Sequence, residues 1–519
     1  MLSRARVLVL LLAAAAALAI SACGGGGGEV SSDDPASLAP ADAPIYVQGT
    51  IRPHGATKTN VEALASTISG FGDPTAQLTA LLDRSLNDTP NLSGKHLSFA
   101  KDIDPWLGDR AGVFVEGLSG NPPAAGIVQS TDTRATKQFI DDTKQKGDKD
   151  RSYKGVDYLV DGTDGTDGTA AGVVGDFLVV GNEQAFKDAV DVSKGGDSLG
   201  DQSDFTNAVD QAPSGSLADV YVGLQQVSDT LRAQDPANAK SLEASIGDTS
   251  GKTVLGSLVP AKDSLELDLA TNANQNFQLS DLSKLIETFP SDSFVAVGIP
   301  NLGATVSKTI DQLEKAGVSG ISKAAIDQQL SSAGLSLDDI TSALGDLGIF
   351  VEGTDKASLQ GAGVITSHSS SNVKNLIGIL SSLATASGQP GISRAQVGNG
   401  FRVTDPQQIG RQSLTVTSSG AKIVIGYGDQ ATKQALSSGG GTLADDPTYK
   451  QAVAALGGNG LSGFVSLAKV FQLADALGAI RDPGYQQARP YLNRLSYAAI
   501  GSGKSGDFST SKVIVGVHG

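Results

Sequence analysis

The segment Ala498–Ser505 has the residue types of a phosphate-binding loop. It reads Ala-Ala-Ile-Gly-Ser-Gly-Lys-Ser, with Lys504 and Ser505 where such a loop contacts phosphate. A phosphate-binding loop depends on a helix that follows it, because the free backbone N–H groups at the helix start point at the phosphates. Here the chain leads instead into an apolar strand predicted at 511–517. We therefore expect 500–511 to be a solvent-exposed loop between antiparallel strands, with Lys504 in water and no bound nucleotide.

A second candidate is a triple Asp-Gly-Thr repeat that places carboxylates at Asp161, Asp164 and Asp167. Calcium loops need oxygen ligands at alternating positions and a closing bidentate acid. The spacing of three and the absence of a closing Glu do not meet that requirement. We expect a hairpin tip between strands at 156–160 and 170–174, with weak calcium binding as the alternative.

Hydrolysis by a side-chain nucleophile needs a base beside that nucleophile, and the sequence offers no recognisable pair of this kind. The histidines lack metal-ligand spacing, and no Gly-x-Ser-x-Gly motif occurs. The histidines are His54, His96, His368 and His518. We therefore predict a protein that is not an enzyme and that holds no cofactor or metal. An envelope hydrolase that uses scattered acids is the competing hypothesis.

Cys23 is the only cysteine in 519 residues. It follows Arg4, Arg6 and an apolar run over 7–20, which is shorter than the roughly 20 residues of a membrane-spanning helix and is typical of a signal peptide. The sequence Ile-Ser-Ala-Cys ending at Cys23 resembles the lipobox of bacterial lipoproteins. This resemblance implies that Cys23 becomes the acylated first residue of the mature chain, with palmitate as a typical acyl group. We predict a signal peptide at 1–22; ordinary secretion with a chance cysteine is the alternative.

Residues 23–37 combine this cysteine with the run Gly24–Gly28 and a short polar stretch, so we expect a flexible tether. The full chain has a net charge of −16, and this acidic balance excludes nucleic acid as a natural partner. It also disfavours attraction to an anionic lipid surface. The expected contact with the membrane is therefore the lipid on Cys23, and the expected location is extracytoplasmic.

One segment of the chain, Ile103–Gly117, recurs as Ile340–Gly353. The alignment matches two pairs of acids, Asp109 with Asp346 and Glu116 with Glu352. Each copy is predicted to form a helical turn that closes on glycine and then a short strand that carries the Glu. The paired Glu residues could line a shared cleft. The structural alternative is that each is a strand-end charge held by a turn N–H or by a nearby Lys or Arg.

The match extends outward in both directions with a period of about 240 residues, which predicts a domain duplication rather than a short-period repeat protein. We place the two homologous repeats at 38–271 and 287–519. In both, most strands are separated by hairpin-length turns, and helices come singly between strand pairs. This pattern favours an α+β fold with a mostly antiparallel sheet, because a doubly wound parallel sheet needs a helix between every two strands.

The motif Asp102-Ile-Asp-Pro-Trp-Leu-Gly108 and the strand and helix over 177–190 resemble a bacterial family catalogued only as a domain of unknown function. Members of that family are often envelope proteins or lipoproteins of this length. The resemblance implies the architecture but no catalytic or ligand-binding residue. The second copy departs from the motif, with Ser342 and Ala343 where the first has Pro105 and Trp106. We expect Trp106 to be a core anchor.

From these observations we expect a lipid-anchored extracytoplasmic protein that binds or scaffolds something in the cell envelope without catalysis. Its partner would be an envelope protein or an apolar ligand. A carrier with an apolar ligand between sheet and helices, or between the repeats, is the alternative. A filled core with an exposed apolar patch would favour the scaffold, and a long dry tunnel would favour the carrier.

Overall fold

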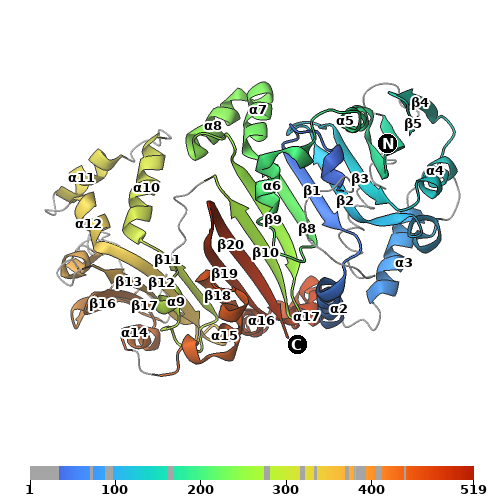
Figure 1. The fold of residues 1–519 in the computed structure, drawn as a ribbon. Helices are drawn as coiled ribbons and strands as arrows, with labels where there is room; N and C mark the ends of the chain where they lie inside the picture. Colours follow the sequence, from blue (N-terminus) through green and yellow to red (C-terminus); the bar gives the residue numbers. More distant parts are fainter. Residues whose placement is uncertain are drawn as a thin grey trace. The chain divides into compact units, whose positions relative to one another are not determined.

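The computed structural model describes residues 34–69, 74–87, 97–161, 168–273, 281–315, 322–331, 336–368, 373–378, 380–381, 393–404, 412–437 and 440–518 (Figure 1). Cys23 and the predicted signal peptide lie outside these residues, as do His96, Asp164 and Asp167. The chain forms two compact units. Unit 1 extends to Phe277 and includes Lys504–Ser511; unit 2 comprises Gln278–Gly503 and Lys512–His518.

Unit 1 contains an antiparallel sheet with the strand order β4-β5-β6-β7-β3-β2-β1-β8-β9-β10. Its strands are β1 (Ile45–Thr50), β2 (Leu107–Val115), β3 (Ala124–Ser130), β4 (Lys149–Tyr153), β5 (Val156–Val160), β6 (Thr169–Val174), β7 (Phe177–Asn182), β8 (Ala218–Gly223), β9 (Thr253–Pro260) and β10 (Ser264–Thr271). Short turns join β4 to β5, β6 to β7 and β9 to β10. The two strands on either side of each of these turns therefore pair with each other.

Helices cover both faces of this sheet. They are η1 (Pro35–Leu38), α2 (Gly55–Ser69), α3 (Pro74–Asn87), the π-helical turn η2 (Phe99–Ile103), α4 (Thr133–Asp142), α5 (Glu183–Ser193), η3 (Leu199–Asp201), α6 (Ser203–Val209), α7 (Leu224–Gln234) and α8 (Pro236–Ile246). On one face, η1, η3, α5 and α6 enclose a core around Tyr46, Phe114 and Tyr221. On the other face, α3, η2 and α4 cover only the part of the sheet that contains Val128 and Leu178.

Unit 2 contains an antiparallel sheet with the order β14-β15-β16-β17-β13-β12-β11-β18-β19-β20. Its strands are β11 (Val295–Ile299), β12 (Leu344–Glu352), β13 (Gln360–Ser367), β14 (Ser393–Val397), β15 (Gly400–Thr404), β16 (Leu414–Ser419), β17 (Lys422–Tyr427), β18 (Gly460–Ser466), β19 (Leu495–Ser505) and β20 (Phe508–Val517). Each strand of unit 2 takes the place of the strand of unit 1 whose number is lower by ten.

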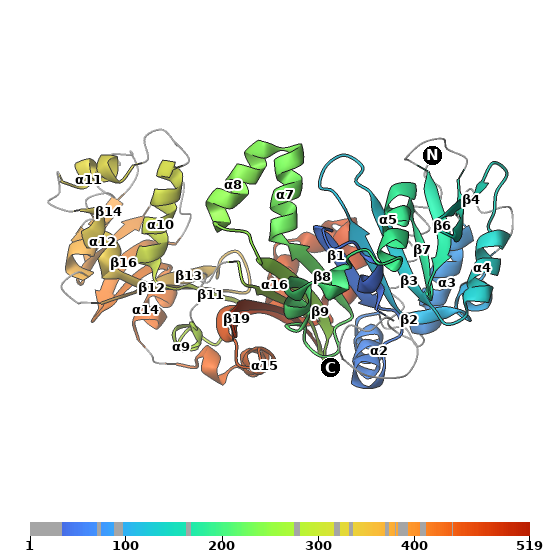
Figure 2. The same ribbon diagram turned by 45° about the horizontal axis from the view of Figure 1, so that its top comes forward.

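The described helices of unit 2 also lie on both faces of its sheet. They include α9 (Ser283–Ile286), α10 (Leu302–Lys315), α11 (Lys323–Ser331), α12 (Leu337–Ala343), α14 (Asp429–Leu436), η4 (Leu443–Asp445), α15 (Pro447–Ala455), α16 (Leu467–Ala476), η5 (Ala479–Arg481) and α17 (Pro483–Leu492). Figure 2 shows α10, α11 and α12 on one side of the strands and α9, α14 and α15 on the other. The core below α9, α14 and α15 is built around Phe350 and Phe464.

The predicted α+β class with largely antiparallel sheet is confirmed by this architecture. Three details differ from the sequence predictions. The strand in each recurring segment is long rather than short, because it begins at Leu107 and Leu344, before the glycine that was expected to close a helical turn. Gly108 and Gly345 are needed inside the strands, since a Cβ there would meet Gln129 Cβ at 2.8 Å and Thr366 Oγ1 at 2.6 Å.

The predicted tether is too long at its C-terminal end. The fold begins by Asp34, whose side chain caps η1, is almost fully buried and pairs with Arg110 at 2.5 Å. Pro35 and Ala36 are also buried. A carboxylate that is withdrawn from water stays charged only beside a partner, and Arg110 on β2, 76 residues further along the chain, supplies that partner. The sequence pattern of 34–37 gave no sign of this long-range contact.

The predicted loop at 500–511 is also wrong in extent. β19 continues through Ser505, and only Gly506 and Asp507 form the turn before β20. The glycines that suggested a loop have a packing role instead. A Cβ at Gly501 would lie 2.7 Å from Leu456 Cδ2, so the strand can pair with β18 there only as glycine. Lys504 is exposed, as predicted.

Candidate functional site

Glu116 and Glu352, the two acids matched by sequence, lie at equivalent strand ends. Val115 pairs with Ile45 and with Ala124, and Val351 pairs in the same way with Val295 and with Gly361. Each Glu is the next residue. The two side chains have different neighbours. Among the described residues, neither Glu forms an ion pair with Lys or Arg, which was one of the two kinds of partner that the structural alternative expected, the other being a turn N–H.

In unit 1, Glu116 faces other acids. Burial raises its pKa to about 8, with further contributions from the charges of Asp188 on α5 and Asp42 before β1 and from a hydrogen bond with Asp188. Two carboxyl groups can share a hydrogen bond only if one of them holds the proton. Gln184 donates to both oxygens of Asp188 at 3.0 Å, which stabilises Asp188 as the carboxylate. Glu116 is therefore the group that carries the proton.

In unit 2, Glu352 is 3% exposed. Its Oε1 accepts a hydrogen bond from Gln360 Nε2 at 2.8 Å, whereas its Oε2 has no partner among the described residues. Burial raises the pKa of Glu352, and the charge of Asp292 adds to this effect. Both units thus place an acid with a raised pKa at this strand end.

Asp109 and Asp346 do not join these acids. They lie towards the opposite end of the same strands, seven residues away in unit 1 and six in unit 2, which is about 20 to 23 Å of extended chain. Asp109 contacts His54 Nε2 at 3.4 Å, and Asp346 accepts a hydrogen bond from the backbone N–H of Asn301 at 2.9 Å. The four matched acids therefore form no single catalytic constellation within either unit.

The remaining candidate residues are dispersed. His54 lies beside β2, His368 is exposed after β13, and His518 is exposed after β20, where its backbone N–H donates to Arg494 O. Asp161 Oδ1 accepts a hydrogen bond from Thr169 N at 3.1 Å and so closes the β5–β6 hairpin. Among the residues that the structure describes, no three His, Cys, Asp or Glu side chains are grouped in a way that could hold a metal ion.

Trp106 is a core residue, as predicted. It is 2% exposed, its Nε1 donates to Asp102 O at 2.7 Å, and its ring lies 5.4 Å from the ring of Phe139. The Asp-Pro-Trp motif thus joins η2 to β2 and α4. Because Trp106 is the single tryptophan of the chain, its fluorescence reports on unit 1.

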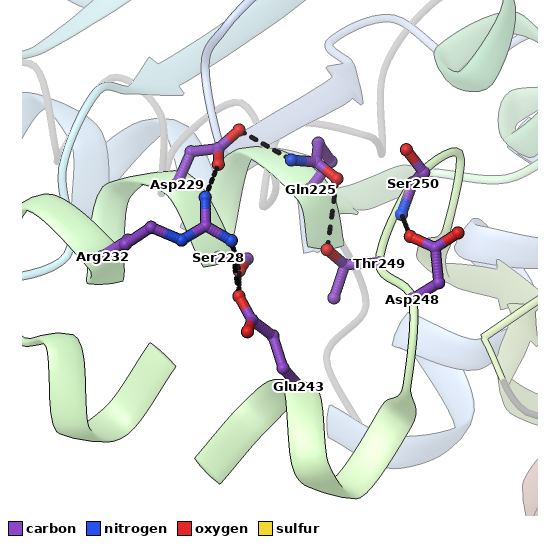
Figure 3. Close-up of polar contacts among 8 residues, drawn as sticks. All are labelled: Gln225, Ser228, Asp229, Arg232, Glu243, Asp248, Thr249 and Ser250. Carbon is purple, nitrogen blue, oxygen red and sulfur yellow. Dashed lines mark hydrogen bonds and ion pairs between the residues drawn. The ribbon is translucent and has the colours of Figure 1, made fainter. Parts of the chain in front are cut away.

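The polar hairpin α7–α8 is followed by another sequence that looks like part of a phosphate loop, Gly247–Thr253, and Figure 3 shows its surroundings. Asp248 Oδ1 accepts a hydrogen bond from the backbone N–H of Ser250 at 3.0 Å. The carboxylate of Asp248 thus occupies a backbone N–H that a phosphate would otherwise bind. Thr249 is buried and donates to Gln225 Oε1 at 3.2 Å. The segment then enters β9 and not a helix, so it lacks the element that a phosphate site requires.

The same hairpin is held by Arg232, which pairs with Asp229 on α7 and with Glu243 on α8 (Figure 3). Ser228 Oγ donates to Glu243 Oε1 at 2.8 Å, and this hydrogen bond together with Arg232 lowers the pKa of Glu243. Glu243 joins α8 to Ser228 and Arg232 on α7, and Asp229 binds Arg232 and Gln225 within α7. We assign this cluster a structural role.

The feature that the sequence predictions missed is an apolar surface on the sheet of unit 1. Side chains that share one face of β2, β1, β8, β9 and β10 are aliphatic, and none is charged; we call this set the aliphatic face. It comprises Val113, Val115, Ile45, Val47, Val220, Val222, Val254, Leu258, Leu265, Leu267 and Leu269. The strand register places these residues opposite one another in rows across the five strands.

Several of these side chains are open to solvent. Leu265, Leu267 and Leu269 of β10 are 37%, 42% and 38% exposed, and Val220 of β8 is 41% exposed. The signal was present in β10, where leucines alternate with Glu266 and Asp268. Such alternation identifies a strand with one apolar face, but the natural assumption is that the leucines point inward. In the structure the leucines point outward, and Glu266 is 9% exposed.

The opposite face of the same strands carries a row of buried polar side chains, Gln48, Asp219 and Ser257. Gln48 Nε2 donates to Asp219 Oδ2 at 3.0 Å, and Ser216 Oγ donates to Asp219 Oδ1 at 2.6 Å. Ser257 of β9 lies next in this row and is 1% exposed. The inner face of these strands thus combines buried polar side chains with the apolar core residues Tyr46, Phe114 and Tyr221, whereas the outer face is aliphatic where polar residues are usual.

The fold and this surface define an α+β protein with antiparallel sheet in each unit and an exposed aliphatic face in unit 1. The chain belongs to the family described as "Protein of unknown function (DUF3352)", whose sequence profile matches residues 2–514. No curated protein matches the sequence. Among the residues that the structure describes, no helix has the length and apolar character needed to cross a membrane.

Solved structures give distant similarities. "Structure of crystal form I of TP0453" is 10% identical, with a TM-score of 0.26, and the match covers 48% of this chain and 82% of that one. "Structure of crystal form IV of TP0453" is 11% identical, with a TM-score of 0.25, and covers 46% and 81%. Similarity at this level says nothing further about the present chain.

Proposed function

We propose that this protein is a non-catalytic, lipid-anchored binding protein on the extracytoplasmic side of a bacterial membrane. We further propose that its aliphatic face contacts what it binds. The observation that carries the proposal is the exposed, uncharged face of β1, β2, β8, β9 and β10. Single exposed hydrophobic residues are ordinary, but contiguous apolar patches on soluble proteins commonly mark interaction sites.

The aliphatic face is not required to complete the core of unit 1. The core around Tyr46, Phe114 and Tyr221 lies on the opposite face and is filled by η1, α5 and α6. Polar residues in place of Leu265, Leu267 and Leu269 would be equally compatible with the sheet, since strands with one solvent-exposed face usually carry polar residues on that face. Retaining leucine at these positions is explained by contact with an apolar partner.

The test of binding uses the neutral apolar dye Nile red with the folded protein. We expect a blue-shifted, saturable emission while the fluorescence of Trp106 keeps the maximum of a buried indole. The matched variants are Leu267→Asp on the aliphatic face and Leu477→Asp at the end of α16, where Leu477 is 55% exposed. Loss of dye binding in the first variant alone is the expected result. Equal dye binding by both variants would refute this site.

The anchor is proposed from Cys23 and from the apolar run that precedes it. Acyl chains contribute about 0.8 kcal/mol per buried CH₂ group, so more than one chain gives stable attachment. Replacement Cys23→Ser should release the protein from membranes or leave the precursor uncleaved. Fractionation of cells that express each form is the measurement, and a processed Ser variant that stays fully on the membrane would disprove acylation.

We also propose that 38–271 and 287–519 are homologous repeats. Their identical strand order and the matching registers at Val115 and Val351 favour this origin. So do two isolated bridges at equivalent places, Pro40 with Ser198 and Pro290 with Thr442. Expression of each range alone, followed by denaturant unfolding, tests whether each is an independently folding repeat.

A further inference from the structure

We propose that the aliphatic face of unit 1 binds one extended acyl chain of an uncharged or zwitterionic lipid, laid across the strands from β10 towards β2. This inference rests on the proposed function and specifies its ligand. It is carried by the composition of the face, by a strip of small residues within it, and by its dimensions.

The composition favours a hydrocarbon chain over a protein partner. The cores of protein–protein interfaces are enriched in aromatic residues, Met and Arg, and most binding energy comes from such anchors. The aliphatic face contains only Val, Leu and Ile, with Ala and Gly between them. It offers no side-chain hydrogen bond. A hydrocarbon needs none, whereas a peptide laid on this surface would lose the solvation of its backbone.

A strip of small residues crosses the face. It runs through Gly256 on β9, Ala218 on β8 and Gly49 on β1. A Cβ built on Gly49 would have only Leu217 O, at 3.5 Å, within 4 Å among the described residues. One on Gly256 would have only Leu269 Cδ2, at 3.3 Å. Above Gly49 the only close atom is thus a backbone oxygen, and above Gly256 it is the end of the flexible Leu269 side chain, which can move; longer aliphatic side chains border the strip.

The larger residues beside this strip include Leu258 on one flank and Val220 and Val47 on the other, and Leu269 pairs with Gly256 at the β10 end of the strip. The five strands from β10 to β2 are adjacent in the sheet. Strands lie about 4.8 Å apart, so the face is about 19 Å wide across its four gaps. A chain that fills one leaflet of a bilayer spans about 15 Å, half of the hydrocarbon core. The two lengths are compatible.

The net charge of the protein favours a ligand whose head group carries no net negative charge. The chain has a net charge of −16, so an anionic head group would be repelled over the distances at which charges act in physiological salt. A neutral or zwitterionic head avoids this repulsion and can remain in water beyond the aliphatic face. The acyl chain alone then makes the contact with the aliphatic face.

The probe is a 16-carbon lysophosphatidylcholine below its micelle concentration, titrated into the full-length folded protein by calorimetry. An 8-carbon analogue and glycerophosphocholine, which is the head group alone, are the comparison ligands. We expect saturable binding of the long-chain probe, at least about tenfold weaker binding of the short one, and no heat from the head group. Binding of the head group alone would overturn the proposal.

Two variants test the place of binding. Gly256→Val fills the strip with a residue that suits a strand and adds no charge, so we expect weaker binding with unchanged unfolding. Leu267→Asp should weaken binding at least about tenfold. Leu477→Asp is the control and should bind as the unmodified protein does. Unchanged affinity in both face variants would refute the site.

The two proposals fail separately. If Nile red binds and Leu267→Asp abolishes it, but lysophosphatidylcholine does not bind, the proposed function stands and the acyl ligand is wrong. If neither ligand binds while Trp106 reports a folded unit 1, both proposals are wrong.

Discussion

Units 1 and 2 share one sheet topology but place different chemistry at the same strand end. Glu116 lies beside Asp188, whereas Glu352 is held by Gln360, and the position that corresponds to Asp188 is Gln434. An amide donates a hydrogen bond at any pH, but two carboxyl groups interact favourably only when one of them is protonated. The same backbone therefore makes unit 1 sensitive to proton concentration at a place where unit 2 uses a neutral donor.

A second difference concerns the exposed sheet face. In unit 2 the corresponding strands also carry aliphatic residues, and Ile299 and Ile500 are 40% and 44% exposed. However, Gly463 takes the place of Val220. After Phe508, β20 continues with Ser509, Thr510, Ser511 and Lys512, whereas β10 carries alternating leucines. The strands of unit 2 therefore offer fewer aliphatic side chains on this face, and the proposed acyl binding concerns unit 1.

The largest expected effect concerns an acid at the start of the matched helices α5 and α14. Glu183 is buried, with Arg151 at 2.7 Å, Lys187 at 2.9 Å and Tyr158 Oη at 2.8 Å. Although burial raises its pKa, the hydrogen bonds from Lys187, Tyr158 and Arg151 lower it overall. Glu183→Ala should destabilise unit 1 by about 3 kcal/mol, the low end for a broken buried ion pair, because the side chains of Arg151 and Lys187 remain partly solvated.

Its counterpart in unit 2 supplies the control. Asp429 pairs with Arg402 at 2.7 Å, but its side chain is 54% exposed. Asp429→Ala should therefore change stability by less than about 1 kcal/mol. Urea unfolding followed by Trp106 emission for unit 1 and by circular dichroism for the whole chain compares the two variants. Equal losses would show that burial does not distinguish these acids.

The next effect tests a feature that the units share. A Cβ at Gly112 would contact Tyr46 Oη and would lie 2.9 Å from Pro35 Cβ. One at Gly348 would contact Phe289 Cζ and would lie 2.9 Å from Leu285 Cδ2. Each glycine lets an aromatic ring lie flat on the sheet. Gly112→Ala and Gly348→Ala should each destabilise the protein by about 2 kcal/mol through overpacking.

Gly363→Ala is the matched control, because the nearest atom to its Cβ would be Leu347 Cδ1 at 3.7 Å, an ordinary contact. The unfolding midpoint in urea is the measurement for all three variants. If Gly363→Ala lowers the midpoint as much as the other two, a general loss of strand glycine and not the aromatic contact explains the result.

A smaller effect is expected from pH. The pKa of Glu116 is about 8 in the folded protein, against 4.5 for an ordinary Glu, so the folded state holds the proton more tightly than the unfolded state. Stability of unit 1 should therefore fall as pH rises from 4.5 to 8 and should level off above that range. Glu116→Gln should remove this contribution. Unfolding monitored by Trp106 at pH values on both sides of the range tests the sign.

Glu352→Gln sharpens the comparison. Burial also raises the pKa of Glu352, but the hydrogen bond from Gln360 opposes the shift. The loss of stability with rising pH should accordingly be smaller in unit 2. A pH dependence that survives in both Gln variants would mean that other groups cause it.

The smallest expected effect is that of Lys504→Ala. Lys504 is exposed near the β19–β20 turn, and surface substitutions of this kind usually change stability by less than about 0.5 kcal/mol. We also expect no binding of Mg-ATP by either form. A saturable calorimetric signal that disappears in Lys504→Ala would contradict this and would restore the nucleotide hypothesis.

Much of the fold could be predicted from local patterns. Strand β3 (Ala124–Ser130) is a mostly apolar run that follows two prolines, and β9 and β10 are apolar-rich runs joined by a short polar turn, so both are visible in the sequence. The recurring segment also placed Glu116 and Glu352 correctly at equivalent strand ends. These features depend on hydrophobic period and turn residues, which act over a few neighbouring positions.

The aliphatic face could not be predicted in the same way. The sequence of β10 determines that Leu265, Leu267 and Leu269 share one side and that Glu266 and Asp268 share the other. Which side meets the core depends on where η1, α5 and α6 pack, and those helices come from segments far away in the chain. Likewise, Asp34 became a buried partner of Arg110 only through a contact across the fold. The sequence alone determined the period of each strand, and tertiary packing determined its orientation, because burial depends on neighbours that local periodicity does not specify.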